Sequence, residues 1–258
     1  MKPFKIFLIT VIILSLTSCE KVIDLKLNTS ASQIVIQGNI NDQPGSCEVK
    51  ISKTIAFDST GVYPPVTGAK VVIEDNFGVS KTLAELTPGT YTSDLYGIIG
   101  RTYTLNVNSE GKEYKAVSKI GNPATIDSLT MKKSNFGNLN LINVVFFDPF
   151  KEANYYHLIE FVNNKRLNGT HVTTNLLSPD KAISYSSSSQ DTDNPIESGD
   201  TIIVWVETVD KGVYEYFRTA GNYRDQSVSP ANPVSNISNG ALGYFNACPV
   251  REVSVIVK

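Results

Sequence analysis

The sequence predicts a mainly β protein made of two antiparallel β-sandwiches, with one short helix in the second. Apolar and polar residues alternate in short runs such as Ile34–Ile40 and Tyr103–Val107, and a period of two is typical of half-buried strands. Turn-forming sequences such as Asn41–Gly45 separate these runs, which favours sandwiches. One stretch, Val213–Ala220, instead has its apolar residues at helical spacing.

The first predicted domain covers residues 33–120. Ile34–Ile40 and Cys47–Ile51 both alternate and flank a turn, so we expect them to form a hairpin. The loop at 56–67 contains Pro64 and Pro65, which cannot donate backbone hydrogen bonds to a sheet. The other strands of this domain are expected at 69–74, 79–86, around 91, 103–107 and 114–118.

The second predicted domain covers residues 121–258, because Gly121-Asn122-Pro123 interrupts both helix and sheet. Val144–Phe147 is apolar on both faces and is expected in the centre of a sheet, whereas the serine-rich run at 183–190 is expected at an edge. The segment 163–180 is polar and predicts a loop. The other strands are expected at 126–132, 139–147, 155–162, 201–208 and 250–257.

The helix and the loop after it are the most distinctive part of the second domain. Asp210 is placed to cap the helix and Gly221 to end it. A loop is predicted from 229 to 243, and the segment from 232 to 245 is a candidate partner or ligand surface. The alternative is a packed loop that closes the sandwich. The candidate surface residues are Asn232, Asn236, Asn239, Leu242, Tyr244, Phe245 and, from the strand at 201–208, Trp205.

The first nineteen residues predict export and a lipid anchor. Lys2 and Lys5 precede an apolar run, and Leu16-Thr17-Ser18-Cys19 follows it, an ending that resembles the bacterial lipobox. Residues 1–18 are therefore predicted to be a signal peptide, Cys19 to receive the lipid and residues 19–32 to form a tether. A transmembrane anchor over residues 4–16 would span only about 20 Å of a ~30 Å hydrocarbon core. A plain signal peptide with an unmodified cysteine is the other alternative.

The charge of the chain argues against one class of partner. The chain carries 23 basic and 25 acidic residues and no basic run, which argues against nucleic acid as a partner.

With Cys19 lipidated, Cys47 and Cys248 remain. Both lie in apolar-patterned segments, which favours two separate buried thiols over a disulfide.

The sequence contains no convincing catalytic or metal-binding motif. No cluster of Cys or Glu with zinc-ligand spacing surrounds either histidine, His157 or His171. The calcium-like start at Asp191 has Pro195 and Ile196 where a calcium loop needs an oxygen ligand and a glycine. No phosphate loop and no serine-hydrolase elbow occurs, although a dispersed Ser-His-Asp triad stays open. We therefore expect no cofactor and no enzymatic activity. Trp205 lies in an apolar strand, which favours a core residue over an exposed sugar-stacking platform.

Three short segments resemble the prealbumin-like, carboxypeptidase-regulatory-type modules, which belong with Ig-like sandwiches. They are Pro65–Val71, Thr87–Tyr91 and Gly100–Leu105. Such modules are usually scaffolds or binding units, so the resemblance implies no catalytic residue for the first domain.

Two further segments, Cys19–Asp24 and Ser235–Phe245, resemble a family of Bacteroidota outer-membrane lipoproteins described as domain of unknown function 4249. Cys248-Pro249 departs from the family pattern. The resemblance implies an outer-membrane lipoprotein, held at the membrane by Cys19, with a TonB-dependent transporter as candidate partner. It leaves open which face of the membrane carries the protein. A surface glycan- or ligand-binding protein is the alternative, and a cryptic hydrolase is the third.

Overall fold

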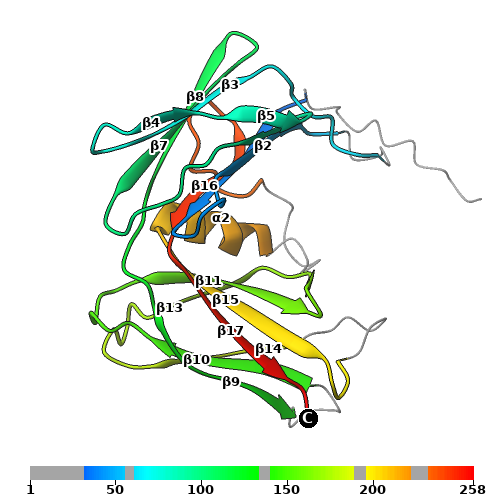
Figure 1. Ribbon diagram of the computed structural model, residues 1–258, viewed down its shortest axis with the longest axis vertical. Helices are drawn as coiled ribbons and strands as arrows, with labels where there is room; N and C mark the ends of the chain where they lie inside the picture. The colour runs from blue at the N-terminus through cyan, green and yellow to red at the C-terminus, as the bar shows by residue number, and fades with distance from the viewer. Residues whose placement is uncertain (1–31, 56–60, 134–139, 189–195, 222–231) are drawn as a thin grey trace, which may run out of the picture. The chain divides into compact units, whose positions relative to one another are not determined.

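The structure is a computed structural model that describes residues 32–55, 61–133, 140–188, 196–221 and 232–258 of the chain. The predicted signal peptide, Cys19 and residues 19–31 of the tether lie outside the described residues, as do residues 191–195 of the calcium-like segment. Residues 32–258 form one compact unit. Within it the strands assemble into two sandwiches, with the helix α2 (Lys211–Gly221) between them (Figure 1).

Two sheets form the first sandwich, and its predicted hairpin is confirmed, because β1 and β2 pair antiparallel. One sheet has the order β16 (Leu242–Cys248), β1 (Ile34–Asn41), β2 (Glu48–Lys53), β6 (Thr90–Thr92), β5 (Ala84–Thr87). The other has the order β4 (Ser80–Thr82), β3 (Lys70–Asp75), β7 (Thr102–Ser109), β8 (Lys112–Lys119).

The single strand predicted at 79–86 is wrong. The segment forms two strands, β4 and β5, which lie in opposite sheets. Leu83 separates them and is buried in the core, so the need to bury this side chain carries the chain from one sheet to the other.

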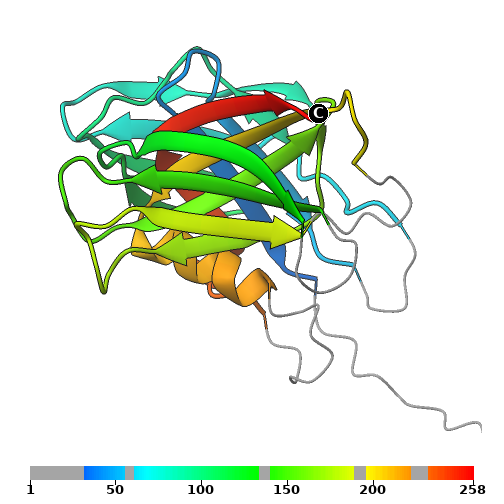
Figure 2. The same cartoon turned by 90° about the horizontal axis from the view of Figure 1, so that it is seen from below.

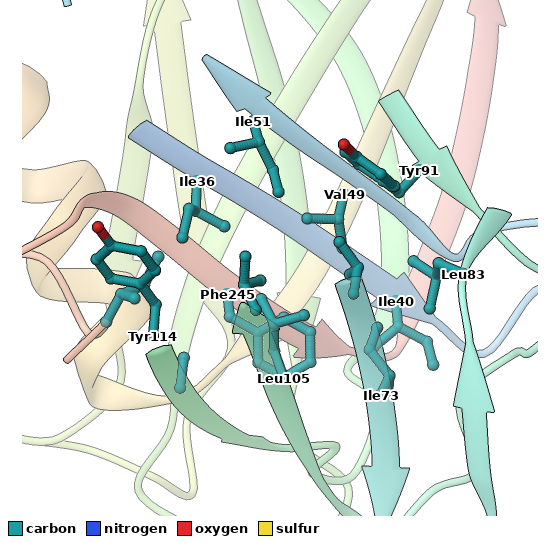
Figure 3. Close-up of a cluster of buried hydrophobic side chains, with 14 of the residues drawn as sticks. Ile36, Ile40, Val49, Ile51, Ile73, Leu83, Tyr91, Leu105, Tyr114 and Phe245 are labelled. Atoms are coloured by element: carbon teal, nitrogen blue, oxygen red, sulfur yellow. The ribbon is translucent and has the colours of Figure 1, made fainter. Parts of the chain in front are cut away.

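A large cluster of apolar side chains forms the core of the first sandwich (Figure 3). Alternate residues of β1 and β2, such as Ile36 and Val49, face alternate residues of β3 and β7, such as Ile73 and Leu105, as period two requires. Phe245 of β16 enters the same core. It lies opposite Gly38, where a Cβ would approach its ring to 2.9 Å.

The second sandwich also has two sheets. One has the order β14 (Ile183–Ser188), β10 (Asn140–Phe147), β9 (Thr125–Lys133), which confirms the predicted edge and central strands. The other has the order β12 (Lys165–Arg166), β11 (Tyr155–Val162), β15 (Thr201–Val209), β17 (Val250–Ile256), and β13 (His171–Thr174) also pairs with β11. The loop predicted at 163–180 therefore contains two short strands. In Figure 2, β17 (red) runs alongside β9 (green), so the two sheets approach each other at this edge.

The helix α2 follows its sequence pattern. The Asp210 carboxylate accepts a hydrogen bond from the Val213 backbone N–H at 3.0 Å, which confirms the predicted N-cap. Val213 is fully buried, and Phe217 packs beside it. The helix contacts β11 and β13 of the second sandwich and β16 of the first.

The chain passes between the sandwiches three times, through residues 120–124, through α2 into β16, and through Pro249 into β17. β16 pairs parallel with β1, with Gly243 opposite Ile36. The predicted domain boundary at residue 121 does not account for the pairing of β16 with β1. That boundary assigns β16 to the second domain, and the first residues of β16 were predicted to be a loop. Local periodicity carries no information on a pairing between segments about 200 residues apart.

Candidate ligand site between the two sandwiches

β16 is buried on both faces, and the two faces differ in chemistry. Phe245 and Ala247 point into the apolar core of the first sandwich and are 0% exposed. Tyr244, Asn246 and Cys248 alternate with them, so they point the other way, towards α2 and the second sandwich. Polar side chains in a doubly buried strand are uncommon and require partners.

The candidate surface at 232–245 is partly packed and partly exposed, and Asn239 is among its exposed residues. The Asn236 side chain holds the Phe245 backbone through two hydrogen bonds of 2.9 Å, one as donor and one as acceptor. Asn239 donates to the Glu113 carbonyl at 2.5 Å, and Leu242 is half-buried. The prediction that Phe245 lies on the surface is wrong. Its ring is buried in the core of the first sandwich, where burial of an apolar side chain stabilises the fold. Asn232 is exposed.

Trp205 is neither a core residue nor a fully exposed platform, the two environments expected for it. It is half-buried on the outer face of β15, where its ring packs against Phe161 with centroids 4.9 Å apart. Its indole N–H donates to Glu252 Oε2 at 2.6 Å. Trp205 borders a groove on one side and a smaller cavity on the other.

The groove has a volume of about 700 Å³ and lies between the turn at 41–46 and β17. Asp42 bridges its two sides. One carboxylate oxygen accepts from the Val250 backbone N–H at 2.9 Å, and the other lies 2.7 Å from Arg251 Nη1. Since Asp42 belongs to the first sandwich and Arg251 to the second, the groove exists only where both are in place.

The cavity has a volume of about 160 Å³ and contains the most concentrated polar chemistry of the junction. Glu207 of β15 is its centre. Glu207 Oε2 lies 2.8 Å from His157 Nδ1 and 3.3 Å from Asn246 Nδ2. The three side chains are almost fully buried. Because they come from β11, β15 and β16, this cluster ties the two sandwiches together.

Cys248 belongs to the same cluster and is not a nucleophile. Burial, and then the charge of nearby Glu207, raise the pKa of the Cys248 thiol well above its ordinary value, so it stays protonated. Cys47 is likewise buried and free. The two predicted separate thiols are confirmed. They lie on either side of β1, with Cys47 in the core of the first sandwich and Cys248 at the junction.

Aromatic rings form the other wall of the cavity. Phe217 of α2 stacks on His157 with centroids 3.9 Å apart and packs against Tyr244 at 4.8 Å. Burial raises the pKa of Tyr244 to about 12, so the phenol keeps its proton. Arg166 lines the cavity too, although it is exposed on β12, and it therefore marks the side that opens to solvent.

A second polar cluster lies inside the second sandwich. Ser187 donates to the Glu160 carboxylate, and His171 Nδ1 lies 3.1 Å from the Tyr185 hydroxyl. Because the serine bonds a carboxylate rather than an imidazole, this is not the order of a Ser-His-Asp triad.

Among the described residues no three His, Cys, Asp or Glu side chains gather as metal ligands. In the same ranges no helix is long and apolar enough to cross a membrane.

Glu207 and Asn246 were not among the site residues predicted from the sequence. The feature that marks them is a polar residue in an otherwise apolar run, Glu207 in Thr201–Val209 and Asn246 beside Phe245 and Ala247. Such residues are buried only when they are hydrogen-bonded. The partners themselves come from three distant strands and could not be read from spacing.

A family model described as "Domain of unknown function (DUF4249)" matches residues 20–254. No curated protein matches the chain. Among solved structures, a "putative carbohydrate binding protein" from Bacteroides uniformis ATCC 8492 is 12% identical over 86% of this chain and 98% of its own, with a TM-score of 0.25. A two-domain fibronectin type-III segment of chicken tenascin is 8% identical over 88% of this chain and 99% of its own, again with a TM-score of 0.25. At such TM-scores neither structure assigns a role to this chain.

Proposed function

Because the chain belongs to the DUF4249 family, we propose that it is a lipid-anchored outer-membrane protein that acts by binding. In this proposal it is a non-enzymatic accessory subunit of a TonB-dependent transporter. The observation that carries the binding role is the junction site, a groove and a cavity that share Trp205 as a wall. Clefts between domains are a preferred place for ligands, since both sides contribute contacts.

The lipid anchor is supported by the N-terminal sequence. Leu16-Thr17-Ser18-Cys19 follows an apolar run, and the family match begins at residue 20, next to Cys19. Two or more acyl chains hold a protein stably at a membrane, whereas one chain holds it only marginally. Intact mass of the native protein tests this anchor. A mass equal to the unmodified polypeptide would contradict it.

The transporter partner is tested by affinity purification of the tagged, native lipoprotein from detergent-solubilised outer membranes. We expect one TonB-dependent barrel in near-equal amount. A Cys19→Ser variant, which cannot be lipidated, serves as the control and should be lost from the membrane fraction. Recovery of the lipoprotein alone from wild-type membranes would contradict a stable accessory subunit.

A surface glycan-binding role is the second candidate, and the environment of Trp205 favours it. An aromatic ring beside Glu252, Asp42 and Arg251 combines an apolar face with charged hydrogen-bonding groups, and sugars use both kinds of contact. A glycan array with the wild type and a Trp205→Ala variant tests this candidate. Binding that Trp205→Ala abolishes would support it, and no binding to any glycan would contradict it.

A further inference from the structure

A residue that lines the junction cavity has a buried hydrogen-bond acceptor without a partner. Asn246 is 1% exposed and lines the cavity, and its Oδ1 has no hydrogen-bond partner among the described residues. Its Nδ2 is directed to Glu207. The reverse amide orientation would set two acceptors against each other, so Oδ1 is the atom left over. A buried acceptor in this state costs free energy until a donor reaches it.

The lining of the cavity suits a positively charged donor. The Glu207 carboxylate lies 3.3 Å from Nδ2 of the Asn246 amide, and Trp205, Phe217 and Tyr244 add aromatic rings to the lining. An ammonium group carries three donors and no acceptor. It is also attracted to aromatic faces when it is desolvated.

The lining of the cavity also includes a positive charge. Arg166 lines it and is exposed, and its guanidinium makes none of the ion pairs found among the described residues. Arginine binds carboxylates in bidentate geometry. The cavity therefore presents acceptors and aromatic rings inside, and a cation at its opening.

We propose that this cavity binds a small zwitterion, such as a single amino acid, with the ammonium group at Asn246 and Glu207 and the carboxylate at Arg166. A cavity of about 160 Å³ is small, which favours a single amino acid over a larger ligand. The inference rests on the proposed binding role of the junction and is independent of the transporter.

The lone tryptophan makes the site directly observable, because Trp205 is the only tryptophan in the chain and lines the cavity. The experiment titrates the full-length lipoprotein in detergent micelles and follows its tryptophan emission. Three matched probes are used, namely leucine, 3-methylbutylamine, which lacks the carboxylate, and 4-methylpentanoate, which lacks the amine. We expect leucine to bind saturably, and each of the other two roughly tenfold or more weaker, since each loses a charge-assisted contact.

Variants separate the two ends of the ligand. Arg166→Gln should remove the preference for leucine over 3-methylbutylamine, whereas Lys165→Gln, at the neighbouring exposed position that does not line the cavity, should change nothing. Asn246→Ser should weaken leucine and the amine alike, with folding checked by circular dichroism. If Asn246→Ser does not fold, the comparison of Arg166→Gln with Lys165→Gln still tests the proposed carboxylate contact.

Three results would overturn the inference. They are no saturable change of emission with leucine, equal affinity for leucine and 4-methylpentanoate, or equal effects of Arg166→Gln and Lys165→Gln. A lipoprotein that binds leucine but recovers no transporter would leave the zwitterion site standing and contradict the transporter alone. Recovery of a transporter without leucine binding would do the reverse.

Discussion

Each sandwich buries a carboxylate, and the two treat its charge in opposite ways. In the first, Asp75 accepts hydrogen bonds from the Arg101 guanidinium and from the backbone N–H groups of Phe77 and Val79. Burial alone would raise the pKa of Asp75, but these donors outweigh it and hold the pKa below its ordinary value. In the second, burial raises the pKa of Glu160, and the hydrogen bond from Ser187 offsets this only in part.

The contrast separates a sandwich with a mainly apolar core from a region that buries several polar side chains. The core of the first sandwich is mainly apolar, and its buried carboxylate, Asp75, has a cation and backbone donors as partners. The second sandwich and the junction instead bury Glu160, His157, Glu207 and Asn246 among apolar residues. Of these groups, Asn246 Oδ1 has no partner among the described residues, and such a group costs stability. Under the proposed binding role, a ligand would supply the missing partner.

The largest effect is expected where the scaffold depends on a close backbone approach. At Gly243 a Cβ would lie 1.9 Å from the Ile36 carbonyl oxygen, and the φ angle is +101°. Gly243→Ala should therefore separate β16 from β1 and lower the free energy of unfolding by at least about 3 kcal/mol. Urea unfolding measures this loss. Gly61→Ala, where nothing lies within 4 Å, is the control, and equal losses in both variants would refute the parallel pairing.

A smaller loss is expected from the paired carboxylate of the first sandwich. Asp75→Asn leaves Arg101 without its partner and should lower the free energy of unfolding by about 2–3 kcal/mol at neutral pH. Because the folded state holds the pKa of Asp75 below 3.8, its contribution is present above that pH and is lost as the pH falls through the folded value. Asp94→Asn, which alters an exposed pair with Lys81, should leave the urea midpoint unchanged. An acid unfolding curve of Asp75→Asn that overlays the wild type would disprove the assigned role.

The smallest effect, and the opposite sign, is expected from Glu160. Its pKa in the folded protein lies above its ordinary value of 4.5, so the folded state binds more protons than the unfolded state between the two values. Stability should therefore fall as the pH rises from 4.5 through the folded pKa. Glu160→Gln keeps the shape and removes the charge, so it should flatten this dependence. Because Glu160 Oε2 also lies 3.7 Å from His171 Nε2, the gain at neutral pH should be at most about 1 kcal/mol. Thermal melts across the pH range measure it, and a loss of stability at neutral pH would mean that the charged form is well paired.

Strands with one buried face were predictable from the sequence, and so was the helix. Ile34–Asn41 and Glu48–Lys53 alternate because one face meets an apolar core and the other does not. Asp210 caps α2 through a hydrogen bond to Val213, three residues along the chain. Such features depend on neighbours in the sequence. The strand at Leu242–Cys248 was missed because it is buried on both faces and has no alternation to detect.

The fold class, the main strands and the capped helix could be predicted from the amino-acid sequence, and the apolar surroundings of Cys47 and Cys248 favoured separate thiols, since each depends on local pattern or composition. The membership of β16 in the first sandwich, the burial of Phe245, and the meeting of Glu207, His157 and Asn246 around one cavity are visible only in the folded molecule. These contacts join residues that are far apart in the chain. Their energies come from burial and pairing, which exist only once both sandwiches have formed.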